Sequence, residues 1–231
     1  MSRTINVGGV LIVVLTISDF HAPFGSPNAI DFLSDLKKEY RPDKIVCLGD
    51  EIDQHSLSDW VHSPEGMSPK DEYEAAIKQL KPLYKLFPNV QVVESNHGRR
   101  PFRKAFNAGL PRVYMKAYRE FMQAPSGWSW CEYLNIENVL YIHGDGFSSK
   151  DGAIRAATGH RKSVCLGHIH AWGGVTYIAN NSSQIFAANA GCLIDYGAYA
   201  FEYSKHQVAK PTIGTCVVLH EKECRFIPMK L

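Results

Sequence analysis

Residues 44–53 read KIVCLGDEID, a short apolar run that stops at a glycine and continues into three acidic side chains. Continuous apolar runs of this length are typical of strands buried on both faces, although periodicity alone does not exclude a buried helix. Four more runs have the same character, and each ends in polar residues: 10–18, 90–95, 138–144 and 162–167. We therefore predict that these five runs are strands and that they decide the fold.

The segments between the runs indicate how the strands are connected. Residues 26–40 and 68–87 each begin with Ser-Pro, at Ser26 and Ser68, which is a favourable start for a helix. Alternation of strand and helix predicts a parallel sheet with right-handed crossovers. The last third of the chain has short β-like segments without long helices, which predicts an antiparallel or mixed second sheet. The irregular region from Pro101 to Trp130 is expected to cover the functional site.

The composition is that of a well-packed globular protein. With 231 residues, 45% hydrophobic and 21% charged, the whole chain (1–231) is expected to form one domain. A formal charge of +2 is too small to indicate a polyanionic partner by itself. The six cysteines form no CxxC pair, and the apolar N-terminal run lacks a cleavage site and is too short to span a bilayer. We therefore expect a cytoplasmic protein with reduced thiols and no membrane segment.

Five polar clusters follow the five predicted strands. In chain order they are Asp19 with His21, Asp50 with Asp53, Asn96 with His97, His143 with Asp145, and His168 with His170. Each cluster alone is common by chance. Because the carboxyl ends of parallel strands meet at one crevice, all five together indicate a single site.

The chemistry of these clusters favours divalent metal ions. They offer carboxylates, imidazoles and one carboxamide but no thiolate, which suits Mn²⁺, iron or Zn²⁺ better than a cysteine-rich structural zinc site. Seven candidate ligands are too many for one tetrahedral ion. Two ions about 3.5–4 Å apart, bridged by a carboxylate, would use them all and would clamp a phosphoryl group.

The five motifs, DFH, GDEID, SNHG, HGD and GHIH, resemble those of the calcineurin-like metallophosphoesterase superfamily, over Asp19 to His170. The resemblance implies a mixed α/β fold, a four-layer αββα sandwich of two mixed sheets flanked by helices. It also implies two divalent ions, with Mn²⁺ expected and iron, zinc or nickel as alternatives. A water activated by both ions would attack phosphorus.

The resemblance also assigns roles by motif position. Asp19, His21 and His170 would hold the first ion, Asn96, His143 and His168 the second, and Asp50 would bridge them. His97 would act at the leaving oxygen, as a proton donor or by stabilising charge. Asp53 is expected to orient His97, and Asp145 to be an acceptor behind the metal ligands, fixing His143 or a neighbouring ligand.

The third motif departs from the family pattern. The protein-phosphatase branch has an arginine and an acidic residue that pair, whereas this chain has Gln54 and Gly98 at those positions. The loss of both partners argues against a phosphoprotein phosphatase. Gly98 is expected to let the backbone turn the following arginines toward the substrate. His55 and His62 follow the second motif in a predicted loop and carry no motif support.

A basic and aromatic segment follows His97. Its cations are Arg99, Arg100, Arg103, Lys104, Arg112, Lys116 and Arg119, and its aromatic residues are Phe102, Phe106, Tyr114 and Tyr118. Such a segment could bind phosphates and stack bases of single-stranded nucleic acid or of a nucleotide. The alternative is an amphipathic helix whose aromatic residues pack on the body and whose cations form a solvated face. Arg99 and Arg100, nearest His97 in the chain, are the expected substrate-binding residues.

These observations predict a metal-dependent phosphoesterase, a hydrolase that acts on phosphoric ester bonds. The expected reaction is that of a phosphodiesterase or nuclease on nucleic acid or nucleotides. A phosphomonoesterase acting on small molecules or proteins is the alternative within enzymes. The alternative outside enzymes is a non-catalytic binding scaffold that keeps the fold.

Overall fold

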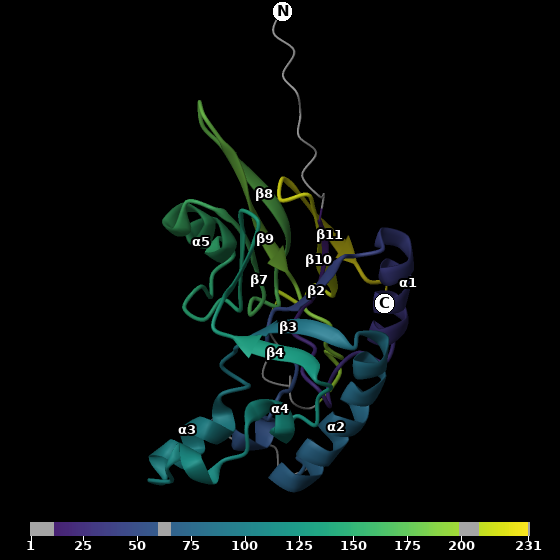
Figure 1. The fold of residues 1–231 in the computed structure, drawn as a ribbon, viewed down its shortest axis with the longest axis vertical. Coiled ribbons are helices and arrows are strands. Elements are labelled where there is room, and N and C mark those ends of the chain that lie inside the picture. Colours follow the sequence, from purple (N-terminus) through teal and green to yellow (C-terminus); the bar gives the residue numbers. More distant parts are fainter. Residues whose placement is uncertain (1–11, 60–65, 199–207, 231) are drawn as a thin grey trace, which may run out of the picture.

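The computed structural model describes residues 12–59, 66–198 and 208–230 (Figure 1). In this part of the chain, one sheet has six strands in the order β11 (Glu223–Pro228), β10 (Gly214–Leu219), β1 (Val13–Ile17), β2 (Lys44–Cys47), β3 (Asn89–Val93) and β4 (Gly127–Cys131). The other has five, in the order β5 (Leu134–Ile136), β6 (Val139–Ile142), β7 (Ser163–Leu166), β9 (Gln184–Ala190) and β8 (Gly173–Ala179). The helices are α1 (Ala29–Tyr40), α2 (Pro69–Leu86), α3 (Arg100–Asn107), α4 (Tyr118–Phe121) and α5 (Gly152–His160), with short 3₁₀ turns η1 (His55–Leu57) and η2 (Arg112–Tyr114).

The predicted alternation of strands and helices is confirmed for the first part of the chain. Strands β1, β2, β3 and β4 are parallel neighbours, and helices α1 and α2 make the first two crossovers. Helix α2 begins as predicted, because Ser68 Oγ accepts a hydrogen bond from the Asp71 amide at 3.2 Å and Pro69 occupies the first turn. Helix α1 begins later than predicted, at Ala29, and its N-cap residue Asn28 makes no side-chain cap.

The five predicted strands form, but they do not share one parallel sheet. Strands β6 and β7 belong to the second sheet, which is mixed because β6, β7 and β9 are parallel neighbours while β5 and β8 run antiparallel. The last third of the chain was expected in the second sheet. This holds for β8 and β9, whereas β10 and β11 pair in the first sheet, with Val14 opposite Val218. Apolar periodicity predicts a strand but not the strand it pairs with, so the sequence does not show which strands belong to which sheet. Residues 10 and 11 of the first predicted strand lie outside the described residues.

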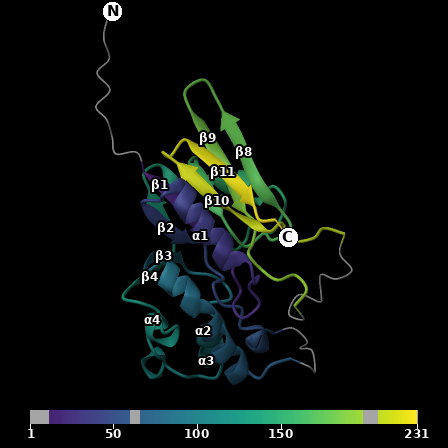
Figure 2. The same ribbon diagram turned by 90° about the vertical axis from the view of Figure 1, so that its right-hand side faces the viewer.

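The layers confirm the predicted αββα sandwich (Figures 1 and 2). Helices α1 and α2 cover the outer face of the first sheet, where Leu15, Leu33 and Leu80 are fully buried. A second core between the two sheets includes Val46 and Tyr141, and a third lies between the second sheet and α5. In Figure 1, α1 and α2 lie on the right and α5 on the left of the strands. Among the described helices, none combines the length and apolarity needed to cross a membrane.

Candidate metal centre

The polar clusters from both sheets meet where their strands end. The side chains fall into three overlapping groups whose potential ligand atoms lie within 4.8 Å of one another: His21, Asp50 and His97; Asp50, His143 and His168; Asp19, Asp50 and His170. Asp50 belongs to all three. Four of these residues, Asp19, His21, Asp50 and His168, have backbone φ angles between 29° and 66°. Left-handed backbone at a non-glycine residue is costly and gathers at functional sites, so these strand ends are shaped for their side chains.

Two pairs of imidazoles converge on either side of the Asp50 carboxylate. His21 Nε2 lies 3.1 Å from His170 Nε2, and His143 Nε2 lies 3.2 Å from His168 Nδ1. Asp50 Oδ2 is 3.4 Å from His21 Nε2 and 3.3 Å from His143 Nε2. One carboxylate oxygen therefore reaches both pairs, which is the position that a bridging ligand requires.

Asn96 and Asp19 complete the two halves of the arrangement. Asn96 Oδ1 lies 2.8 Å from His143 Nε2, so the amide belongs with the His143 and His168 pair. Asp19 Oδ2 lies 3.7 Å from His170 Nε2. Asp19 Oδ1 lies at the same distance, 3.7 Å, from His143 Nδ1. The seven predicted ligands thus lie together, and their division between two ions stays a prediction.

Asp19 tests whether these residues suit a metal ion. Both of its carboxylate oxygens are buried, and within the described residues neither has a hydrogen-bond partner. Burial raises the pKa of this carboxyl group well above its ordinary value. A Cβ at Gly167 would lie 2.7 Å from Asp19 Oδ1, so the chain leaves room for the carboxylate by omitting a side chain. A buried carboxylate without a partner costs several kcal/mol, about the penalty that a bound cation removes. The donor set therefore fits divalent ions.

Hydrogen bonds to the Nδ1 atoms of two histidines direct the opposite ring nitrogens into the site. His21 Nδ1 donates to Asp53 Oδ2 at 2.7 Å, and His143 Nδ1 donates to the Leu48 carbonyl at 2.8 Å. Each bond places a ring proton on Nδ1 and turns Nε2 toward the site, the orientation that a metal-binding imidazole requires.

Asp53 contacts His97 through its main chain and not through its carboxylate. Its carboxylate holds His21, and it is the backbone carbonyl of Asp53 that accepts from His97 Nδ1, at 2.7 Å. The carboxylate is farther away, with Oδ1 3.7 Å from His97 Nδ1. One residue thus orients two imidazoles, one through its side chain and one through its main chain.

The two predicted substrate-binding arginines have different environments. The Arg100 side chain is only 11% exposed, and it donates to the carbonyls of Asp53 and Gln54 and to His97 Nε2 at 2.9–3.1 Å. Arg100 is therefore a brace for the loops around His97. Arg99 is 48% exposed and forms an ion pair with Asp145. Only Arg99 is in a position that a substrate reaches easily.

His97 is a neutral imidazole in this arrangement. Its Nδ1 donates to a carbonyl and its Nε2 accepts from Arg100, while Nε2 lies 3.9 Å from Asp50 Oδ2. The pKa of His97 is lowered to about 4, chiefly by burial; Asp50 and Asp53 oppose this shift, and the Arg100 cation adds to it. The imidazole reaches the edge of the candidate centre as predicted.

Asp145 does not supply the hydrogen bond expected of it. The acceptor that fixes His143 is the Leu48 carbonyl, whereas Asp145 Oδ1 lies 3.6 Å from the opposite nitrogen, His143 Nε2. Its second oxygen pairs with Arg99. Asp145 is thus a partner of the exposed cation at the rim.

The structure gives a different reason for Gly98. Gly98 does not have a left-handed φ angle, and an added Cβ would lie 2.6 Å from Tyr118 Oη. The glycine therefore makes room for a tyrosine instead of turning the backbone. Gln54 occupies the place of the family's arginine, and its side-chain amide donates to the His97 carbonyl at 3.0 Å. His55 lies in η1, and His62 lies outside the described residues.

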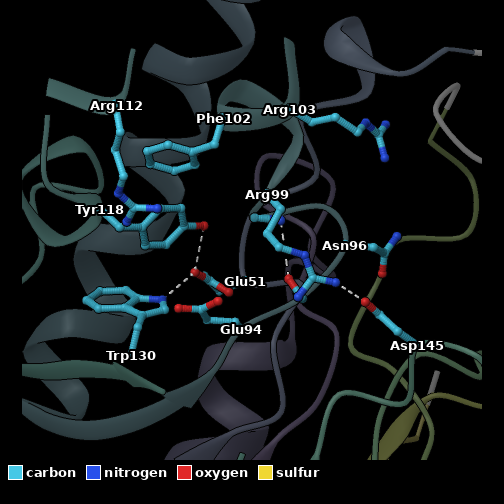
Figure 3. A pocket seen from close by; sticks show the side chains of 12 residues that line it. Glu51, Glu94, Asn96, Arg99, Phe102, Arg103, Arg112, Tyr118, Trp130 and Asp145 are labelled. Carbon is cyan, nitrogen blue, oxygen red and sulfur yellow. Dashed lines mark hydrogen bonds and ion pairs between the residues drawn. The ribbon is translucent and has the colours of Figure 1, made fainter. Parts of the chain in front are cut away.

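A cavity of about 520 Å³ adjoins the candidate centre, and Asn96 lines both (Figure 3). Its walls include Phe102, Tyr118 and Trp130, and Arg99 lies at the side facing Asp145. The sequence did not identify Glu51, Glu94 or Trp130 as site residues, although they also line it. The sequence feature that could have identified Glu94 is its position directly before the SNHG motif, at the end of β3.

Comparison with known proteins places these features in a wider group. The sequence model of a family described as "Calcineurin-like phosphoesterase" matches residues 12–196. The gene 54 protein of Mycobacterium phage D29 is 28% identical over 138 residues, which are 58% of this chain and 48% of that protein. The chain thus spans about half the length of this curated relative.

Solved structures with a similar chain trace have low sequence identity to it. They include Vacuolar Protein Sorting 29 from Cryptosporidium parvum, 14% identical with a TM-score of 0.47, covering 95% of this chain and 92% of that one. A metallophosphoesterase from Sphaerobacter thermophilus is 16% identical with a TM-score of 0.46, covering 96% and 89%. The nuclease MPE of Pseudomonas putida is 12% identical with a TM-score of 0.36, covering 93% and 86%.

Proposed function

The chain belongs to the calcineurin-like phosphoesterase family, and from that premise we propose that it is a metal-dependent phosphodiesterase that hydrolyses nucleic acid or nucleotides. The proposed substrate class rests on the chemical character of the surface beside the candidate centre. There, exposed cations and exposed aromatic rings alternate on one segment, which continues from the loop that holds His97. Family membership supports the reaction, and this segment supports the substrate.

The proposed metal ligands follow the two halves of the centre. Asp19, His21 and His170 would hold one ion, Asn96, His143 and His168 the other, and Asp50 both. Two divalent ions, of which Mn²⁺ is our proposal with iron, zinc or nickel as alternatives, would polarise the phosphoryl group and lower the pKa of the attacking water.

The remaining roles belong to side chains that contact the substrate or hold those that do. His97 would lie at the leaving oxygen, held by the Asp53 carbonyl through Nδ1. Its Nε2 now accepts from Arg100. A phosphate oxygen that draws the Arg100 guanidinium away would let Nε2 take up a proton from solvent, which the imidazole would then pass to the leaving oxygen. Arg99, exposed at the rim, would contact a phosphate outside the metal centre.

The segment after His97 favours a polymeric or nucleotide substrate. The alternative of aromatic residues packed on the body does not hold for two of the four, because Phe106 is 80% and Tyr114 76% exposed. The cations Arg103 and Lys104 lie on the same helix, α3, as Phe106, and each pairs with Asp59. Exposed rings stack bases and nearby cations bind phosphates, a combination typical of single-stranded nucleic acid binding.

Two other functions compete with this proposal. A phosphomonoesterase would use the same metal ligands, but exposed stacking rings serve no purpose for a small phosphate. A non-catalytic scaffold would be expected to lose ligands, whereas all seven predicted ligands and His97 are present in this chain. We therefore place both below the phosphodiesterase.

A paired assay tests the proposal. Bis(p-nitrophenyl) phosphate and p-nitrophenyl phosphate are compared with Mn²⁺ present, followed by single- and double-stranded oligonucleotides and cyclic nucleotides. We expect the diester to be hydrolysed faster than the monoester. A strong monoester preference would favour the phosphomonoesterase, and no metal uptake with no hydrolysis of either ester would favour the scaffold.

Arg99→Ala tests the role of the basic segment. Because Arg99 is exposed and Arg100 is a brace, the single variant leaves the loops around His97 supported. We expect oligonucleotide cleavage to fall while aryl diester cleavage stays unchanged. Lys38→Ala on α1, where the lysine is exposed and pairs with Asp35, is the control. Equal losses on both substrates would mean that the segment is a solvated face.

A further inference from the structure

The cavity beside the candidate centre has a chemical character that the phosphoryl reaction does not explain. Three aromatic side chains form one wall: the Tyr118 ring lies 5.8 Å from the Phe102 ring and 5.2 Å from the Trp130 ring, measured between centroids. Figure 3 shows these rings on one side of the cavity and Arg99 with Asn96 on the other. A volume of about 520 Å³ is in the range of ligand pockets.

The aromatic wall offers a flat surface to a planar group. The Arg112 guanidinium, which is itself planar, lies over the Phe102 ring at 5.2 Å from its centroid. Aromatic faces that accept a guanidinium also accept a nucleobase, because both interactions use the π face. The phosphate side of a bound nucleotide would then face Arg99, Arg103 and the metal ligand Asn96.

Two carboxylates line the cavity, and one of them already accepts hydrogen bonds from the aromatic wall. Glu51 is buried, and its Oε1 accepts from Tyr118 Oη at 3.1 Å and from Trp130 Nε1 at 3.0 Å. Glu94 is exposed, and its side chain makes no hydrogen bond or ion pair with the residues that the structure describes. An ionised carboxylate only accepts hydrogen bonds, and its two oxygens match two adjacent N–H donors.

We propose that this cavity holds a guanine base of the substrate, stacked against Phe102 and hydrogen-bonded to Glu94. Guanine presents N1–H and N2–H side by side on its Watson–Crick edge, so it satisfies both oxygens of one carboxylate. Adenine and cytosine place an acceptor next to their amino group, and uracil offers a single N–H between two carbonyls. The inference rests on the proposed function, because it treats the cavity as the base subsite of a phosphodiesterase.

Equilibrium binding tests the subsite without relying on turnover. GMP, AMP, CMP and UMP are titrated by calorimetry into the metal-free wild-type protein and into Glu94→Gln, Phe102→Ala and Glu132→Gln. Glu132 is an exposed glutamate that directly follows the neighbouring strand β4, as Glu94 follows β3, and it does not line the cavity, so it is the matched control. Thermal unfolding followed by circular dichroism establishes that each variant is folded.

We expect GMP to bind the wild-type protein about tenfold more tightly than the other three nucleotides, the discrimination typical of one bidentate pair. Glu94→Gln should remove that preference, Phe102→Ala should weaken all four nucleotides, and Glu132→Gln should behave as wild type. Equal affinity for the four nucleotides, no binding of any of them, or a guanine preference that survives Glu94→Gln would overturn the inference.

Hydrolysis of bis(p-nitrophenyl) phosphate with Mn²⁺, measured on the same preparations, separates this inference from the proposed function. If the wild-type protein cleaves the aryl diester and oligonucleotides without regard to base, the phosphodiesterase stands and the guanine subsite is wrong. If it cleaves no phosphodiester, the proposed function is wrong, and so is the subsite as part of it.

Discussion

Replacing Asp53 with asparagine separates two roles for this carboxylate. In the structure it accepts from the metal-side imidazole His21 at 2.7 Å, with both groups buried, while His97 is held by the Asp53 main chain. Asparagine keeps the shape and the main-chain carbonyl but turns a charge-assisted hydrogen bond into a neutral one. We therefore expect Asp53→Asn to weaken metal binding and to leave the orientation of His97 intact.

The expected magnitude follows from the position of Asp53 behind a ligand. Loss of such a partner typically costs about 10–100-fold in metal affinity, or about 1.4–2.7 kcal/mol. Retained shape and a remaining neutral acceptor place Asp53→Asn toward the lower end, at about tenfold. Turnover should recover when the Mn²⁺ concentration is raised by the same factor.

Titration calorimetry with Mn²⁺, together with bis(p-nitrophenyl) phosphate hydrolysis at increasing Mn²⁺, measures both quantities. Asp59→Asn is the matched control, because that carboxylate is 61% exposed and pairs only with Arg103 and Lys104 among the described residues. Unchanged Mn²⁺ affinity with reduced turnover at saturating metal would refute this reasoning and restore the role at His97 that the sequence suggested. No change in either quantity would remove Asp53 from the site altogether.

Three further changes test other features of the centre. Asp19→Asn should stabilise the metal-free protein by about 1–3 kcal/mol, because it replaces a buried carboxylate whose oxygens accept no hydrogen bond from the described residues. It should also abolish the rise in Tm that Mn²⁺ gives the wild type, and a variant that melts below the wild type in EDTA, measured by calorimetry, would contradict the expected stabilisation. Gly98→Ala should lower the free energy of unfolding in urea by about 1–3 kcal/mol, because its Cβ would lie 2.6 Å from Tyr118 Oη. Adding Tyr118→Phe should restore part of that stability, and a double variant whose loss equals the sum of the two single losses would contradict the contact. Arg100→Ala should lower the free energy of unfolding by about 1.5–3 kcal/mol and slow the hydrolysis of every substrate, since it leaves two carbonyls without their charged donor. Unchanged stability with a selective loss of oligonucleotide cleavage would show instead that Arg100 binds the substrate.

The sequence predicted the strands of this fold, and the polar residues that meet at their ends, because both follow local rules. An apolar run that ends in polar residues marks the end of a strand wherever that strand lies. Asp19, Asp50 and His143 could therefore be assigned to one site before their sheets were known. The partition of the strands between two sheets was not predictable, because β10 pairs with β1 through contacts of high sequence separation.

The contacts that support the site were harder to predict than the site itself. Arg99 and Arg100 are adjacent in sequence, but the turn into α3 sends one guanidinium to the rim and the other behind His97. The direction of a side chain at a helix start depends on backbone angles that the residue types do not specify. Glu94 was missed for a related reason, since an exposed glutamate at a strand end has no distinctive pattern until the cavity beside it is known.

The pairing of β1 with β10 has a consequence for synthesis. Strand β1 lies between β2 and β10, and about 200 residues separate Val14 from its partner Val218. On a ribosome that adds ~5–20 residues per second, β10 would be synthesised about 10–40 s after β1. During this time one edge of a strongly apolar strand stays open, which is a known route to aggregation. The first sheet of the nascent chain therefore closes only after β10 has been synthesised.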